Sequence, residues 1–180
     1  MPPRGVRGAI ISGIMDIDLH VNGVAFSLSE PLEVKKLSSA RCEKLGLLNR
    51  LAMKPPSGYV IYWAKNCEIS RFGGRFLVWA NLDTSRGSSE MSGTSAYLYF
   101  KDDILEKVAF QVLLSEMMAI GGTAEFQTLC KDSFGTPVSD SPTSWMDSRA
   151  VVFCSLYHTH DKALFVWMTL RYMQEHGLSG

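Results

Sequence analysis

Alternating hydrophobic and polar residues predict a β-hairpin near the start of the chain. Residues 16–21 and 24–28 alternate in this way on either side of Asn22-Gly23, and this dipeptide accepts the positive φ values of a type I′ turn. Folding about the turn brings the apolar side chains of both segments to one face and the polar side chains to the other. We therefore expect a sheet with one face towards the core and one towards water.

Two segments have the periodicity of short helices. Residues 33–46 place apolar side chains at helical spacing and end at Gly46, where a C-terminal cap needs a left-handed residue. Residues 124–134 lie between Thr123, which can cap a helix N-terminus, and Gly135, which can end a helix. The pattern predicts one short helix in each part of the chain.

The remaining apolar segments predict strands. Residues 59–72 and 75–82 flank Gly73-Gly74, a candidate hairpin turn, and the sheet is expected to resume at residues 96–100. The apolar residues of the next segment fit either a helix or a strand.

Two segments near the C-terminus predict central strands. Residues 149–157 and 163–171 flank a polar turn, and both alternating sets of side chains are apolar in each segment. Such strands lie in the middle of a sheet that is covered on both faces.

A weak internal repeat relates the two parts of the chain. The repeat favours a strand for residues 108–114, because residues 108–110 align with the second strand of the Asn22-Gly23 hairpin. It predicts an α+β fold of two tandem, similar halves, each with antiparallel strands and one short helix, packed as one compact unit. The expected divisions are a first half at 15–82, a linker at 83–94, a second half at 95–172, and loose termini at 1–14 and 173–180. The matching features, separated by 82 to 88 residues, are Val24-Ala25-Phe26 with Val108-Ala109-Phe110, Cys42 with Cys130, Trp63 with Trp145, and Trp79 with Trp167.

Part of this pattern resembles a known group of domains. The features concerned are a short helix ending in Phe134-Gly135-Thr136-Pro137, a polar loop, and Trp145 opening a hairpin that closes at Phe165-Val166-Trp167. They resemble the unit of bacterial β-lactamase-inhibitor-like and outer-membrane assembly lipoprotein-like domains, and two such units in tandem are similar to the inhibitor proteins of that group. The resemblance covers residues 24–82 and 108–170. The chain departs from the group's pattern because it has neither a lipobox nor a cysteine pair bracketing a loop within one half.

Composition narrows the classes of function. The chain has 180 residues, with 18 basic and 18 acidic side chains, so no field of the whole molecule attracts nucleic acid or an anionic membrane. No segment approaches the ~20 apolar residues that a membrane-spanning helix requires. The first 14 residues lack the long apolar run and cleavage site of a secretory signal. We expect a cytoplasmic protein, with the periplasm as the alternative.

The cysteine and histidine residues give no firm candidate for a catalytic or metal-binding site. Four cysteines, at positions 42, 67, 130 and 154, lack the spacing of zinc ligands, and we expect buried, reduced thiols. Cys154, His158 and His160 would share one face of a strand and could hold zinc, but the two histidines lie in a predicted turn. Without a catalytic motif in the sequence, we expect no catalytic residue, no metal and no cofactor.

Aromatic and arginine side chains are the better candidates for a functional surface. Arg71 and Arg75 flank the Gly73-Gly74 turn, and tyrosine, tryptophan and arginine are the residue types that anchor protein interfaces. The residues expected to contact a partner are Arg71, Arg75, Trp79, Tyr97 and Tyr99.

We therefore expect a non-enzymatic protein-binding module that acts as an inhibitor, immunity protein or assembly chaperone would, through a sheet face and hairpin tips. The partner is a protein of unknown identity, and a homodimer also fits. The alternative is a small-ligand-binding protein or hydrolase that uses the seam between the halves, with His20, His158 and His160 as candidates.

Overall fold

The chain forms two antiparallel sheets with short helices at their margins. The computed structural model describes residues 13–72, 95–113, 130–131, 134–138, 144–157 and 162–177. In chain order the elements are the 3-10 helix η1 (Ile14–Asp16), β1 (Leu19–Val21), β2 (Val24–Phe26), α2 (Val34–Ser39), β3 (Glu43–Lys44), α3 (Leu47–Met53), β4 (Tyr59–Ala64), β5 (Ile69–Phe72), β6 (Ala96–Lys101), β7 (Ile104–Leu113), β8 (Ser144–Met146), β9 (Ala150–Tyr157), β10 (Lys162–Thr169) and α7 (Leu170–His176). The α+β class predicted from the sequence is confirmed.

The larger sheet has seven strands, in the order β3-β4-β6-β7-β10-β9-β8. Each pair of neighbours is antiparallel. Residues 108–113 of the strand predicted at 108–114 belong to β7, at the centre of this sheet, and residue 114 lies outside the described residues. Strands β9 and β10 also have neighbours on both sides, as their doubly apolar patterns predicted.

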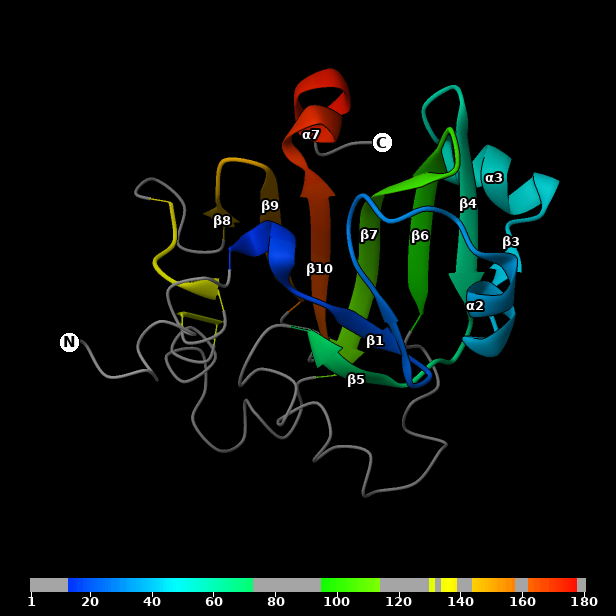
Figure 1. Ribbon diagram of the computed structural model, residues 1–180, viewed down its shortest axis with the longest axis horizontal. Coiled ribbons are helices and arrows are strands. Elements are labelled where there is room, and N and C mark those ends of the chain that lie inside the picture. Colours follow the sequence, from blue (N-terminus) through cyan, green and yellow to red (C-terminus); the bar gives the residue numbers. More distant parts are fainter. Residues whose placement is uncertain are drawn as a thin grey trace.

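The smaller sheet, in the order β2-β1-β5, covers one face of the larger sheet. Figure 1 shows β1 and β5 crossing in front of β7 and β10. Phe72 of β5 links the two sheets, because its ring centroid lies 4.8 Å from that of Phe110 and 5.7 Å from that of Phe165. The main hydrophobic core lies between the sheets, and we call the side of the larger sheet that it covers the core face.

The hairpin predicted at the start of the chain is confirmed. Strands β1 and β2 pair Leu19 with Phe26 and Val21 with Val24. The turn residues Asn22 and Gly23 have φ values of 48° and 81°, as a type I′ turn requires.

The helix predicted at residues 33–46 is shorter than expected. Helix α2 ends at Ser39, and Arg41 takes a left-handed conformation with φ 58°. The amide N–H groups of Arg41 and Cys42 donate to the carbonyls of Ser38 and Leu37, which is the hydrogen-bond pattern of a Schellman motif. The chain then leaves the helix and forms β3, so that this part of the predicted helix is an edge strand. The end of the second predicted helix is as expected, because the Gly135 N–H donates to the Lys131 carbonyl.

Two helices that the pattern did not predict flank the larger sheet. Helix α3 follows β3 directly. Residues 163–171 were expected to be one strand, but β10 ends at Thr169 and α7 begins at Leu170. The Thr169 hydroxyl accepts a hydrogen bond from the Tyr172 amide at 3.1 Å, so it caps the helix and stops the strand. The predicted strand at 59–72 is likewise two strands, β4 and β5, which belong to different sheets.

The two-halves prediction is not confirmed. Residues 24–26 lie in the smaller sheet, whereas the matching residues 108–110 lie at the centre of the larger sheet. Trp145 is buried in the main core, whereas Trp63 packs against a second cluster on the opposite face. Trp79, residues 73–82 and the linker at 83–94 lie outside the described residues.

Candidate functional site

The face of the larger sheet opposite the core face carries a row of half-buried apolar side chains. Its five members are neighbours across successive strand pairs: Trp63 opposes Tyr97, Tyr97 opposes Ala109, Ala109 opposes Val166, and Val166 opposes Phe153. All five side chains are partly exposed. We call this set the aromatic row.

Trp63 and Tyr97 form the most aromatic end of the row. Their rings stack with centroids 5.8 Å apart and an interplanar angle of 17°. The ammonium group of Lys65 lies 5.9 Å from the centre of the Trp63 ring, a distance at which a cation is attracted to the ring face. The stack therefore presents a rigid aromatic surface with a cation beside it.

The next row on the same face is buried. Tyr99, two residues from Tyr97, is only 5% exposed and lies 6.3 Å from the ring of Tyr172 in α7. Burial raises the pKa of Tyr99 to about 12. Of the two tyrosines predicted to contact a partner, the structure places Tyr97 at the surface and Tyr99 in the core beneath α7.

The other predicted contact residues are only partly described. The backbone of Arg71 lies in β5 opposite His20 of β1, and its side chain lies outside the described residues, as do Arg75 and Trp79. The pairing puts Arg71 in the smaller sheet, whereas Tyr97 is in the larger sheet. The structure therefore brings Tyr97 together with Trp63, a residue that the sequence did not single out as a contact.

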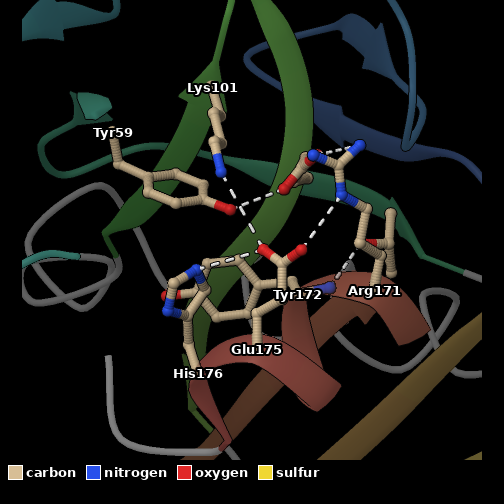
Figure 2. Close-up of polar contacts among 8 residues, drawn as sticks. Tyr59, Lys101, Arg171, Tyr172, Glu175 and His176 are labelled. Atoms are coloured by element: carbon tan, nitrogen blue, oxygen red, sulfur yellow. Dashed lines mark hydrogen bonds and ion pairs between the residues drawn. The ribbon is translucent and has the colours of Figure 1, made fainter. Parts of the chain in front are cut away.

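A polar cluster holds α7 against this face of the sheet (Figure 2). The Tyr59 hydroxyl donates to Glu106 Oε2 at 2.6 Å, in a buried hydrogen bond. Burial raises the pKa of Tyr59, and the hydrogen bond to Glu106 raises it further. Tyr59 is therefore a phenol at neutral pH and a hydrogen-bond donor, not a base or a nucleophile.

Charged side chains of α7 complete the cluster. Arg171 lies 4.0 Å from Glu106 Oε1 and 3.4 Å from Glu175 Oε1. Lys101 lies 3.9 Å from Glu175 Oε2, and His176 lies 3.6 Å from the same oxygen. The carboxylate of Glu106, followed by that of Glu175, raises the pKa of Arg171. These contacts tie the exposed side of α7 to β6 and β7.

Lys107 is the buried amine of this region. It is 4% exposed, and its Nζ lies 4.6 Å from the centre of the Tyr99 ring and 5.0 Å from that of Tyr172. Burial lowers the pKa of Lys107 to about 8. In a fraction of the molecules this amine is thus neutral near physiological pH, but the rings of Tyr99 and Tyr172 enclose it.

Sequence reasoning missed Glu106 and Lys107, although a signal was present. Two consecutive charged residues interrupt the apolar alternation of β7, which is typical of a β-bulge. The structure has this bulge, since Tyr99 opposes Lys107 while Phe100 opposes Leu105. The extra residue is Glu106, whose side chain reaches Tyr59.

The cysteine thiols are poor nucleophiles in this environment. All four are free, with Cys67, Cys130 and Cys154 buried. Burial raises the pKa of Cys67 to about 11 and that of Cys154 to about 12. Burial also raises the pKa of Cys42 to about 12, so none of these groups is a thiolate at neutral pH.

The histidine candidates do not converge in the described structure. His20 is half-buried in β1, opposite Ala25 of β2. His158 and His160 lie outside the described residues. Among the residues that are described, no three His, Cys, Asp or Glu side chains lie close enough together to hold a metal ion.

Comparisons with protein-family models, curated proteins and solved structures found no match to this chain. The resemblance to β-lactamase-inhibitor-like domains therefore rests on the sequence motifs alone and stays a prediction. No helix in the described part of the chain has the length and apolar character needed to cross a membrane.

Proposed function

We propose that the chain is a non-enzymatic protein-binding module that contacts a protein partner through the aromatic row, in the cytoplasm. The observation that carries the proposal is the alignment of Trp63, Tyr97, Ala109, Val166 and Phe153 as one half-exposed row across five strands. Contiguous apolar patches of this kind mark interaction sites on soluble proteins.

The surroundings of the row support this proposal. Gln111 and Leu164 oppose each other in the next row along the sheet, and Leu164 opposes the exposed Ser155. The aromatic row thus has a more polar margin on this side. An apolar centre with a polar rim is the usual anatomy of a protein interface.

The chemistry of the polar cluster also favours binding over turnover. The groups with raised pKa values, Tyr59 and the thiols, are protonated at neutral pH. Lys107, whose amine is partly neutral, is enclosed by aromatic rings. This arrangement is suited to fixing α7 and, through Tyr99, the sheet face on which the aromatic row lies.

The test is a site-specific cross-linking experiment followed by a binding measurement. A photoreactive amino acid is placed at Tyr97 and, as the control, at Tyr62, which is also half-buried but packs towards the core face with its ring 5.9 Å from Phe100. The partner that cross-links from position 97 is then produced recombinantly and titrated against the parent chain and Trp63→Ala.

We expect Trp63→Ala to weaken binding of the partner by about 30-fold, since a tryptophan that anchors a protein interface contributes ~2 kcal/mol or more. Unchanged affinity in a folded Trp63→Ala protein would contradict the proposal. So would cross-linking from position 62 alone, or a reaction that Lys107→Met abolishes while the fold is kept.

A further inference from the structure

One segment holds nearly all the exposed large apolar side chains of the described structure. Val34 is 73% exposed, Leu47 73%, Leu48 83% and Leu51 64%, and the fifth such residue is Met146 at 46%. The first four lie within 18 positions of one another in the sequence, in α2 and α3. Exposed leucines in such numbers mark a contact surface.

The same segment has a net positive charge, although the net charge of the whole chain is zero. Residues 33–54 contain six basic and two acidic side chains, a net charge of +4, which leaves −4 for the rest of the chain because the total is zero. Lys35, Arg41, Lys44 and Lys54 are exposed. The charge asymmetry is local, so it is invisible in the overall composition.

Helix α3 turns its leucines away from the protein. None of its residues is buried, and the guanidinium group of Arg50 points inwards, donating to the Tyr59 carbonyl at 2.7 Å. Leu47, Leu48 and Leu51 have the spacing of one helix side. In an ordinary surface helix the apolar side faces the core and the charged side faces water, so α3 has the reverse orientation.

Helix α3 lies at the margin of the molecule, where a large flat surface can reach it. Figure 1 shows α3 at the margin of the molecule, beside β3 and β4 and on the same side as α2. Strand β3 ends the larger sheet, so this margin projects beyond it. The helix is anchored there by the Arg50 hydrogen bond and by Met53, which packs on the second hydrophobic cluster.

We propose that this margin, comprising α2, β3 and α3, docks on the surface of an anionic lipid bilayer. The leucines of α3 enter the boundary between headgroups and acyl chains, and the exposed lysine and arginine side chains contact anionic headgroups. Exposed leucines and a net positive charge within one segment are the two features that binding to an anionic lipid surface requires. The proposal concerns lying on the membrane, not spanning it. Its leucines and exposed basic side chains are not members of the aromatic row, although Glu43 of β3 lies opposite Trp63 at the end of that row.

The experiment is co-sedimentation with vesicles of phosphatidylcholine alone or of phosphatidylcholine with about one-third phosphatidylglycerol. We expect binding only to the anionic vesicles, and release at high salt because salt screens the charges. Leu48→Gln and Lys44→Glu should each lower binding by about tenfold or more. The matched controls Met146→Gln and Lys131→Glu change exposed residues of the same kinds elsewhere and should bind as the parent does.

The proposal would be overturned if the parent protein bound both vesicle types equally or bound neither. It would also be overturned if Leu48→Gln bound the anionic vesicles as well as the parent does. It would also be overturned if Leu48→Gln instead abolished a concentration-dependent dimer, because the leucines would then form a protein interface. Leu48→Gln should leave the affinity for the aromatic-row partner unchanged, so the two proposals fail separately.

Discussion

Lys107 places an amine in the protein interior, between the rings of Tyr99 and Tyr172. Its pKa is lowered from 10.5 to about 8 in the folded protein, because burial disfavours the charged form. Between these two pH values the unfolded chain binds more protons than the folded chain. The contribution of Lys107 to stability therefore rises with pH in this window.

The prediction is that the contribution of Lys107 to the free energy of unfolding increases between about pH 8 and pH 10.5, by on the order of 2 kcal/mol. Lys107→Met removes the titrating group, so this variant should be more stable than the parent below about pH 8 and the difference should shrink as the pH rises. Urea unfolding of both proteins across this range measures the effect. Lys35→Met, at an exposed position, is the control, and its stability difference from the parent should not change with pH. If the difference between Lys107→Met and the parent is equally constant, the lowered pKa of Lys107 is refuted.

Glu106 shows why a residue's role depends on its surroundings. In the sequence it is one of 18 acidic residues, and most such side chains lie in water. The β-bulge turns it towards the Tyr59 hydroxyl and the Arg171 guanidinium, which belong to segments far from it in the chain. The change from alternation to two consecutive charges could have indicated the bulge, but nothing local could have named these partners.

At the scale of an element, α7 depends on a single side-chain cap at its start. The Thr169 hydroxyl accepts from the Tyr172 amide at 3.1 Å, and this bond separates β10 from the helix. The helix in turn supplies Tyr172 to the second hydrophobic cluster and Arg171 to the polar cluster.

We predict that Thr169→Val lowers the free energy of unfolding by about 1 kcal/mol, because valine keeps the shape of threonine but cannot accept the hydrogen bond. Thr169→Ser keeps the hydroxyl and should cost less. Chemical denaturation of the parent, Thr169→Val and Thr169→Ser measures the two costs. If Thr169→Ser costs as much as Thr169→Val, the loss comes from packing and the cap has no energetic role.

Helix α2 and strand β3 show how an element boundary can escape the sequence pattern. The apolar spacing of residues 33–46 continues past Ser39, so periodicity alone extends the helix. Arg41 in a left-handed conformation ends it without the glycine that usually marks such a cap. Pairing of Glu43 and Lys44 with Trp63 and Tyr62 of β4 then stabilises the extended backbone.

At the scale of the whole molecule, the two sheets depend on one aromatic junction. Phe72 is fully buried, and its ring lies within 6 Å of those of Phe110, Phe134, Phe165 and Trp167. Phe110, Phe165 and Trp167 belong to strands β7 and β10 of the larger sheet. Phe134 belongs to the helical segment before Gly135. The smaller sheet has only three short strands, so it depends on packing against the larger sheet, to which Phe72 contributes.

Phe72→Ala should therefore lower the free energy of unfolding by about 3–5 kcal/mol. Because the sheets share one core, circular dichroism and tryptophan fluorescence should report a single coincident transition. Phe153→Ala is the matched control, since Phe153 is only half-buried on the opposite face, and its cost should be clearly smaller. Equal costs, or two transitions that do not coincide, would contradict the shared core.

The α+β class, the Asn22-Gly23 hairpin and the central strands β9 and β10 could be predicted from the sequence alone, whereas local periodicity left β7 open between a helix and a strand. These features depend on local alternation and on turn residues, which neighbouring positions specify. Tyr97 could also be assigned to one face of a strand, because side chains alternate along a strand whatever it pairs with.

The position of α7 came only from the tertiary structure: on one face of β6, its Tyr172 packs on Tyr99, which is buried, whereas Tyr97 stays half-exposed. The tertiary structure also placed β4 and β5 in different sheets, joined Trp63 to Tyr97, and left the leucines of α3 facing outwards. Each of these outcomes depends on pairing between segments that are distant in the chain, and such pairing leaves no periodic trace in either segment. The two-halves prediction is not confirmed, since residues 24–26 and the matching residues 108–110 belong to different sheets.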